Sequence, residues 1–436
     1  MDTIYALASG AGRAGIAVYR LSGPQAGAAL VALSGRSLPP PRQAMRVKLA
    51  DRAGEAIDDG LALWFPAPSS FTGEDVVELQ LHGGRAVAAA LGEALVELGL
   101  RPAEAGEFSK RAVLAGKLDF TRAEAVADLI DAETAAQRRQ ALRQMGGALE
   151  ALVEGWRAKL VRALALVEAV IDFADEGVGE VELERAAARI ADLAGEMAAS
   201  LADRRRGERL RDGFHVAILG APNAGKSSLL NRLAGREAAI VSATAGTTRD
   251  IIEIHLDLGG WPVVVADTAG LRDSACAIEA EGVRRALARA EAADLKLALF
   301  ESGTIDPATR DLIDGDTLVV VNKADLAGAV PAEVAGRPAL AVSALTGLGL
   351  DQLLAALEAE VAARLDGGGA APLTRQRHRA AVSECLAALG RFAAAPEVEL
   401  AAEDLRLAAR ALGRITGRID VEELLDVVFR DFCIGK

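Results

Sequence analysis

The sequence has few residues able to hold a zinc ion or form a disulfide. Only three cysteines, Cys276, Cys385 and Cys433, and four histidines occur in 436 residues. No two of the cysteines have the spacing of a metal-binding or redox motif, and recognition of such motifs depends on that spacing. Structural zinc and structural disulfides are therefore not expected.

Long apolar runs are also missing. No stretch approaches the roughly 18 consecutive apolar residues that would suggest a membrane-spanning helix. The first residues lack the basic segment followed by an apolar stretch that marks a secretory signal. We therefore expect a cytoplasmic protein that does not contact a membrane.

Positive charge is in deficit. The formal net charge is -13, which argues against an extended nucleic-acid-binding surface, because phosphate contacts require clustered Lys and Arg. Two short basic clusters remain: Arg204, Arg205, Arg206, Arg209 and Arg211, and then Arg375, Arg377 and Arg379. Such runs more often form solvated helix faces than RNA sites. Any RNA contact is expected to be local.

The length and the changing residue pattern predict several domains. A chain of 436 residues exceeds what one hydrophobic core usually supports. In residues 1–118, short apolar alternations such as 16–21 and 76–81, an Ala-rich segment at 86–98, and interspersed Gly and Pro predict a small α+β domain. Residues 119–212 are rich in Ala, Leu, Glu and Arg. Their apolar residues recur at the spacing of one helix face, at Leu149, Leu152, Val153, Trp156, Leu160, Leu164, Val167 and Ile171.

A different pattern covers residues 213–365, where apolar runs typical of strands alternate with helical stretches. This alternation predicts a parallel, doubly wound sheet, with strands at His215–Leu219, Trp261–Ala266, Leu295–Phe300, Leu318–Val321 and Ala339–Val342. The helical pattern returns in residues 366–436 after a glycine-rich break. We therefore predict one discontinuous helical domain with the α/β domain inserted into it.

A phosphate-binding loop follows the first predicted strand of the α/β domain. Residues 220–227 read G-x-x-x-x-G-K-S between a strand and a helix, which is the context that the P-loop motif requires. The backbone amides at the helix N-terminus favour anions. Lys226 would neutralise the β- and γ-phosphates, and the Ser227 hydroxyl would ligate Mg²⁺.

Four more segments occur in the order that a GTPase needs. Residues 246–250 (G-T-T-R-D) resemble switch I, with Thr248 as a second Mg²⁺ ligand, and 267–270 (D-T-A-G) resemble the Mg²⁺-linked aspartate motif. Residues 322–325 (N-K-A-D) match the guanine-reading motif, in which Asp325 accepts hydrogen bonds that adenine cannot donate. Residues 343–345 complete the base pocket. The GTP site is predicted to comprise Asn223, Ala224, Gly225, Lys226, Ser227, Ser228, Ser242, Ala243, Thr244, Ala245, Gly246, Thr247, Thr248, Asp267, Thr268, Ala269, Gly270, Asn322, Lys323, Asp325, Ser343 and Ala344.

The residue that orients the attacking water differs from the Ras pattern. Leu271 occupies the position where a glutamine is expected after the aspartate motif. Another group must therefore orient the water. Glu279 is the candidate catalytic carboxylate, and the alternative is that it is an exposed helix residue.

Together these motifs resemble the MnmE (TrmE) family of tRNA modification GTPases, and the resemblance covers nearly the whole chain. Segments outside the nucleotide domain make it specific. They are Phe71–Asp75 with Glu78, His82–Gly84, Gly106–Ser109, Lys117–Asp119, Ile171–Phe173 and the terminal Phe432–Lys436.

The resemblance implies an N-terminal folate-binding domain (1–118) that forms a homodimer, a helical domain in two parts (119–212 and 366–436), and an inserted GTPase domain (213–365). It implies that a tetrahydrofolate derivative, 5-formyl- or methylene-tetrahydrofolate, binds Arg20, Glu78, Lys117 and Lys436. It also implies action on the wobble uridine of certain tRNAs, in a heterotetramer with the flavoprotein MnmG. FAD would belong to MnmG, because this chain has no dinucleotide fingerprint.

The chain also resembles the potassium-activated TrmE-Era-EngA-YihA-like P-loop GTPases. In these proteins a K⁺ ion occupies the place of an arginine finger when two GTPase domains meet. The resemblance assigns the Asn223 side chain and backbone oxygens of Ser242, Thr244 and Thr247 as K⁺ ligands. A cation there would neutralise charge at the phosphates.

Two other functions share parts of this pattern. A ribosome-assembly GTPase would have the same nucleotide motifs, but it normally adds an RNA-binding module, and the region after the GTPase domain has no basic G-x-x-G segment. A folate-dependent one-carbon transferase that only binds GTP as a regulator is the second alternative. Folate binding without a need for GTP hydrolysis would favour it.

Overall fold

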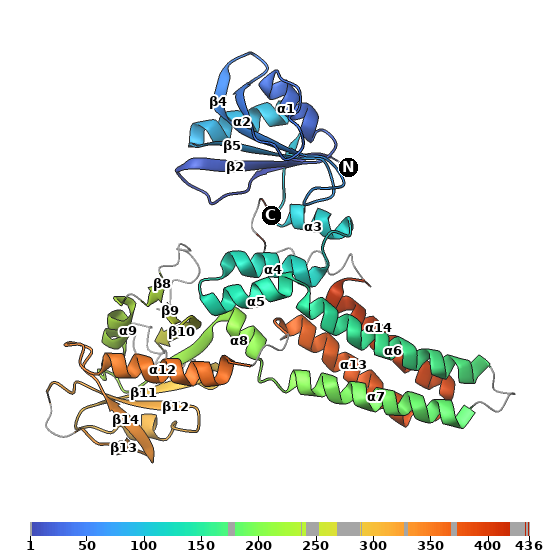
Figure 1. The fold of residues 1–436 in the computed structure, drawn as a ribbon. Coiled ribbons are helices and arrows are strands. Elements are labelled where there is room, and N and C mark those ends of the chain that lie inside the picture. The colour runs from blue at the N-terminus through green and yellow to red at the C-terminus, as the bar shows by residue number, and fades with distance from the viewer. Residues whose placement is uncertain are drawn as a thin grey trace, which may run out of the picture. The chain divides into compact units, whose positions relative to one another are not determined.

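The computed structural model describes residues 2–172, 179–236, 238–240, 253–267, 288, 290–326, 330–367, 373–418, 432 and 435. These residues form two compact units. Unit 1 comprises the described parts of 1–127, 150–175 and 394–436, and unit 2 those of 128–149 and 176–393. The multidomain α/β and α fold class expected from the sequence is confirmed (Figure 1). Within these ranges no helix is both long and apolar enough to cross a membrane.

Unit 1 contains a sheet of six strands in the order β3-β4-β5-β2-β1-β6. Only β1 and β6 pair in parallel. The strands are β1 (Ile4–Leu7), β2 (Ala14–Ser22), β3 (Met45–Ala50), β4 (Ala56–Phe65), β5 (Val76–Gly83) and β6 (Arg101–Pro102), and the helices that follow β2 and β5 are α1 (Ala26–Ser34) and α2 (Arg85–Glu97). The apolar alternations at 16–21 and 76–81 thus lie in β2 and β5, and the Ala-rich segment forms α2.

The core of this sheet follows from side-chain alternation along the strands. Tyr19 and Leu21 of β2 and Leu79 of β5 are buried, together with Leu30 of α1 and Leu95 of α2. Successive side chains of a strand point to opposite faces, so every second residue reaches the helices. The other face of β2 and β5 carries polar residues that belong to a candidate site described below.

Charged side chains tie the start of the chain to α3 (Glu107–Leu114). Arg111 pairs with Asp2 at 2.8 Å, Glu74 at 3.1 Å and Glu107 at 2.9 Å, and Arg101 pairs with Glu107 at 2.6 Å. Burial by itself would raise the pKa of the Glu107 carboxyl, but hydrogen bonds from Arg101, the backbone and Arg111 hold it below its usual value. An ionised Glu107 therefore helps to hold the loop that carries Glu74 against α3.

The helices of unit 1 are α4 (Phe120–Asp131), α6 (Ala148–Asp172) and α14 (Val398–Thr416), although α4 and α6 each extend by a few residues into the ranges assigned to unit 2. The long helix predicted from apolar spacing is confirmed as α6, whose Val153, Trp156, Leu160 and Val167 are buried. The end of α14 packs tightly on α4. Gly417, at φ 79°, would bring an added Cβ within 2.0 Å of the Phe120 ring.

Unit 2 is built on an eight-stranded sheet in the order β13-β14-β12-β11-β7-β10-β9-β8. The five central strands from β14 to β10 are parallel, so the doubly wound sheet predicted from the sequence is confirmed. The strands are β7 (Phe214–Leu219), β8 (Ala239–Ile240), β9 (Glu253–Leu258), β10 (Trp261–Asp267), β11 (Leu295–Glu301), β12 (Thr317–Asn322), β13 (Glu333–Val334) and β14 (Arg337–Ala341). The five predicted strands agree with β7, β10, β11, β12 and β14 to within two residues at each end.

Helices surround this sheet, and Figure 1 shows α9 and α12 beside it. Leu229 of α9 and Leu353, Leu357 and Val361 of α12 belong to the same buried core as the central strands. The helices of unit 2 are α5 (Ala135–Met145), α7 (Gly179–Leu201), α8 (Arg206–Asp212), α9 (Lys226–Ala234), α11 (Pro307–Arg310), α12 (Leu350–Leu365) and α13 (Gln376–Ala394).

Helix α5 begins at a defined point because of its sequence. The Thr134 side chain accepts a hydrogen bond from the Gln137 backbone N–H, and the Gln137 side chain accepts from the Thr134 backbone N–H. This capping box satisfies two amides that the helix leaves unpaired. The Ala136 backbone N–H also donates to Gly260 O at 2.9 Å, so the first turn of α5 is attached to the turn that precedes β10.

Candidate GTP-binding site

The P-loop connects β7 to α9 and depends on two glycines. Gly220 (φ 159°) would place an added Cβ 2.5 Å from Leu299 O, and Gly225 (φ 94°) would place one 2.2 Å from Asn322 Nδ2. Only glycine permits these close approaches together with a positive φ. Asn223 also has a positive φ of 67°, so the loop curves back before α9 begins at Lys226.

Lys226 is buried within this loop. Its Nζ donates to Gly220 O at 2.7 Å and to Ala221 O at 3.0 Å. Burial lowers the pKa of the Lys226 ammonium, while the negative charges of Asp267 and Asp306 act in the opposite direction. The structure thus places one ammonium group inside the loop, where the motif requires a positive charge for phosphate.

Ser227 and Asp267 meet at the end of the sheet. The Ser227 hydroxyl donates to Asp267 Oδ2 at 2.8 Å, and Asp267 is buried at the last position of β10. Because β10 and β7 are parallel neighbours, Asp267 stands beside Ile218 just before the P-loop. Hydroxyl and carboxylate oxygens are the kind of ligand atoms that Mg²⁺ binds.

Asn322 joins the P-loop to the segment that begins at Ser343. Its Nδ2 donates to Ala224 O at 2.8 Å, and its Oδ1 accepts from the Ala344 backbone N–H at 3.0 Å. Asn322 and Ser343 are both buried. Three segments predicted separately from the sequence are therefore brought together, and Asp325 lies exposed at the end of the same N-K-A-D segment.

The structure adds one contact that sequence reasoning missed. Lys323 (φ 60°) pairs through its Nζ with Glu301 Oε1 at 2.8 Å. Glu301 ends β11, next to Asn322 in the parallel register of β12. Its partner became apparent from strand pairing, because the two residues are distant in the chain.

Part of the predicted site lies outside the described residues. This part includes both switch segments, the catalytic candidate and the last folate residue. The residues are Ser242, Ala243, Thr244, Ala245, Gly246, Thr247, Thr248, Thr268, Ala269, Gly270, Glu279 and Lys436.

A second group of predicted residues meets in unit 1. Arg20 of β2 and Glu78 of β5 are register partners, and Arg20 Nη2 lies 2.8 Å from Glu78 Oε1. The Arg20 guanidinium also lies 5.4 Å from the centre of the Phe71 ring. Lys117 comes close to the same loop, since its Cε would be 3.3 Å from a Cβ added at Gly73. The three folate candidates in the described residues thus lie around one loop.

The basic clusters noted in the sequence are largely engaged in ion pairs. Arg205 pairs with Glu208, Arg209 with Asp294 and Arg211 with Asp128 and Asp212. Arg375 also pairs with Asp128, and Arg379 pairs with Asp203 and Glu208. These pairs favour a structural role for most of both clusters.

The doubly wound sheet, the P-loop and the N-K-A-D segment define the protein as a P-loop GTPase. Its sequence is 67% identical over 440 residues to "tRNA modification GTPase MnmE" of Paramagnetospirillum magneticum, covering 100% of both chains. The MnmE proteins of Parvibaculum lavamentivorans and Rhodospirillum rubrum are 60% and 59% identical, again over 100% of both chains. The family descriptions "GTP-binding protein TrmE N-terminus" and "MnmE helical domain" match residues 3–117 and 120–433. The chain belongs to the MnmE (TrmE) family of tRNA modification GTPases.

Proposed function

We propose that this GTPase works with the flavoprotein MnmG to add a carboxymethylaminomethyl or aminomethyl group to the wobble uridine of certain tRNAs, using a one-carbon unit from tetrahydrofolate. The observation that carries the GTPase half is the convergence of Lys226, the Ser227–Asp267 hydrogen bond and Asn322 at the end of the sheet. Relatives over the full length that are named tRNA modification GTPases support the substrate class.

Ser227 of α9 and Asp267 at the end of β10 carry oxygens that suit a Mg²⁺ ion. We propose that Ser227 and Thr248 bind it directly and that Asp267, which accepts the Ser227 hydroxyl hydrogen bond, orients this ligand. The ion would neutralise charge on the β- and γ-phosphates. Lys226 would supply the second positive charge from inside the loop.

A K⁺ ion would also neutralise charge on the phosphates. We propose that Asn223 and backbone oxygens of Ser242, Thr244 and Thr247 hold K⁺, and that Glu279 orients the attacking water. Among these residues the structure describes only Asn223, which lies in the P-loop at a positive φ of 67°.

Steady-state GTP hydrolysis in matched KCl and NaCl buffers tests this proposal. We expect K⁺ to raise kcat about tenfold or more over Na⁺, since a missing transition-state cation costs at least that much. Glu279→Ala should lose most of the activity in both salts, and Asn223→Ala should lose the K⁺ stimulation selectively. Equal rates in the two salts would favour the ribosome-assembly alternative.

Unit 1 supplies the proposed folate site. Lys117 would bind the glutamate carboxylates of the folate, while Glu78, together with Arg20 that lies 2.8 Å from it, would face the pterin donors. Lys436 is the fourth proposed ligand. The Phe71 ring, whose centre lies 5.4 Å from the Arg20 guanidinium, supports this assignment, because a flat pterin can lie against an aromatic side chain.

Binding of 5-formyltetrahydrofolate, measured by calorimetry, tests the folate proposal. Arg20→Ala should weaken binding by about tenfold or more, since a hydrogen bond to a charged group is worth about 1.5–3 kcal/mol. Arg46→Ala is the matched control. Arg46 is exposed on the edge strand β3 and pairs with Asp59 of β4. Equal affinities for the two variants would contradict the assignment. If folate binding persists but tRNA modification does not require GTP hydrolysis, the transferase alternative gains support.

We also propose the assembly that the family resemblance implies. The protein would form a homodimer through the folate-binding domain (1–118) and a heterotetramer with MnmG, in the cytoplasm. FAD would be bound by MnmG, and the acidic net charge of -13 suggests that most tRNA contacts are made by MnmG as well.

A further inference from the structure

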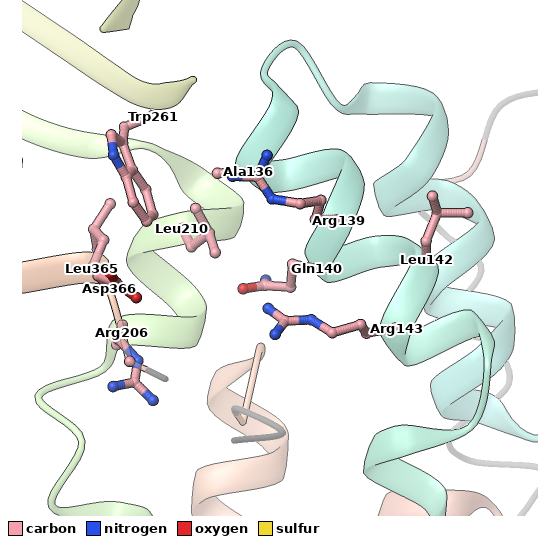
Figure 2. A pocket seen from close by; sticks show the side chains of 11 residues that line it. Ala136, Arg139, Gln140, Leu142, Arg143, Arg206, Leu210, Trp261, Leu365 and Asp366 are labelled. Carbon is pink, nitrogen blue, oxygen red and sulfur yellow. The ribbon is translucent and has the colours of Figure 1, made fainter. Parts of the chain in front are cut away.

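A pocket of about 450 Å³ lies in unit 2, outside the nucleotide motifs. Its walls come from α5, from α8, from the start of β10 and from the end of α12, as Figure 2 shows. A cavity of this size lies in the range that binds small organic ligands. The lining includes Arg139, Gln140, Arg143, Arg206 and Trp261.

The pocket carries positive charge in an acidic protein. Its charged lining consists of three arginines and Asp366, whereas the whole chain has a net charge of -13. Arg139 and Arg143 lie one turn apart on α5. Neither has a hydrogen bond or ion pair through its side chain in the part of the chain that the structure describes. Like charges at this spacing destabilise a helix, so an anion between them would remove an unfavourable interaction.

Gln140 adds a buried acceptor to the pocket. It is only 4% exposed, and its Nε2 donates to Gly207 O at 3.0 Å. Its Oε1 accepts no hydrogen bond from any described residue. A buried carbonyl without a donor is unfavourable. An N–H donor of a ligand that reaches this oxygen would satisfy it.

Trp261 gives the pocket a flat apolar wall. Figure 2 shows its indole beside Leu210 and Leu365, opposite the side chains that extend from α5. Aromatic side chains stack on nucleobases with little preference for the base. An anion site, an acceptor for N–H and an aromatic wall are therefore combined in one cavity.

We propose that this pocket binds a nucleoside monophosphate unit, with the phosphate at Arg139 and Arg143 and the base against Trp261 and Gln140. Guanidinium groups bind phosphate with charge-assisted hydrogen bonds. The unit is either a free nucleotide or a residue of an RNA strand, since the recognised chemistry is the same.

The pocket is separate from the GTP site. Trp261 and Asp267 are the first and last residues of β10, and a strand of this length spans about 20 Å. No residue of the P-loop or of the N-K-A-D segment lines the cavity. The proposal therefore does not depend on the proposed function.

Calorimetry on the full chain, saturated with GDP and Mg²⁺ to occupy the guanine site, tests the proposal with uridine monophosphate, uridine and inorganic phosphate. We expect saturable binding of uridine monophosphate, at least tenfold tighter than that of either fragment. The double variant R139Q/R143Q should weaken it at least tenfold. R138Q is the matched control, because Arg138 is exposed on the same helix outside the pocket, and it should change the affinity less than twofold.

Trp261→Leu separates the two halves of the site. It should weaken binding of uridine monophosphate and leave the affinity for phosphate unchanged. The retained phosphate affinity would also show that the pocket is folded in this variant. Thermal unfolding checks the fold of the double variant. The proposal is overturned if uridine monophosphate shows no saturable binding, or if inorganic phosphate binds as tightly as the nucleotide. It is also overturned if R139Q/R143Q and R138Q lose the same amount of affinity for uridine monophosphate.

A 5′-phosphorylated RNA tetranucleotide identifies the source of the ligand. Tighter binding than that of uridine monophosphate would assign the pocket to RNA, and weaker binding would assign it to a free nucleotide. In both cases R139Q/R143Q should weaken binding of the ligand. These experiments measure binding to the pocket rather than GTP hydrolysis, so a negative result would leave the proposed function untouched.

Discussion

Asp325→Asn should reduce the affinity for GTP on the order of 10³-fold and create a preference for xanthosine triphosphate. Guanine presents a ring N–H and an amine, both donors, to the two carboxylate oxygens of Asp325. An asparagine would place an N–H donor opposite one of these donors. Sites that lose a specific polar match reject the ligand by several orders of magnitude, because buried polar groups are left unpaired.

The structure supports this expectation through the position of the N-K-A-D segment. Asn322 is buried and bonded to the P-loop and to Ala344, so the segment is held by a residue other than Asp325. Asp325 itself is exposed, and its replacement should leave the fold intact.

Nucleotide affinities of the Asp325→Asn protein are measured by competition against a fluorescent guanine nucleotide. Asp311→Asn is the control, because this aspartate is exposed and pairs only with the neighbouring Arg310 among the described residues. It should not alter the affinity for GTP. Retention of GTP binding by Asp325→Asn would remove Asp325 from the site.

Lys226→Met should reduce kcat for GTP hydrolysis by about 10² to 10³ and weaken GTP binding at least about tenfold. Methionine keeps the length of the side chain but removes its charge. In the structure the ammonium group is bound only to the loop carbonyls of Gly220 and Ala221 among its described hydrogen-bond partners. The charge is thus placed for a ligand rather than for a carboxylate of the protein.

Single-turnover hydrolysis and direct binding measurements separate the two effects. Lys296→Met is the matched control, since Lys296 is the second residue of β11, at the opposite end of the strand from Glu301, and pairs with Asp314 at 2.7 Å. Its hydrolysis rate should stay within about twofold of the wild type. A Lys226→Met protein with wild-type kcat would contradict the phosphate-binding role.

The five parallel strands of unit 2 were predictable because they are covered on both faces. Such strands appear as continuous apolar runs, and β7, β10, β11 and β12 were found almost at their true bounds. Helix α6 was predictable for a similar reason, since its buried residues recur at helical spacing. The nucleotide motifs were predictable because loop chemistry demands particular residues at fixed positions.

The arrangement of the helices was not predictable in the same way. Helices α6 and α14 belong to unit 1, whereas α5, α7 and α13 belong to unit 2. The discontinuous helical domain with the α/β domain inserted into it stays a prediction. An amphipathic pattern shows which face of a helix is buried and does not show which partner covers it. The Lys323–Glu301 pair was missed for a comparable reason, because only strand register makes the two residues neighbours.

The sequence by itself determined that this protein is a P-loop GTPase of the MnmE family, since the phosphate and base motifs consist of residues close together in the chain. Tertiary structure alone decided which distant side chains share a site. Asn322 reaches Ala224 because β12 and β7 lie in one sheet with β11 between them, and Arg20 meets Glu78 because β2 pairs with β5. Arg139, Gln140 and Trp261 line one cavity only because α5 packs beside β10. The physical reason is that local propensity and motif chemistry act over a few residues, whereas a cavity is formed by contacts between elements far apart in the chain.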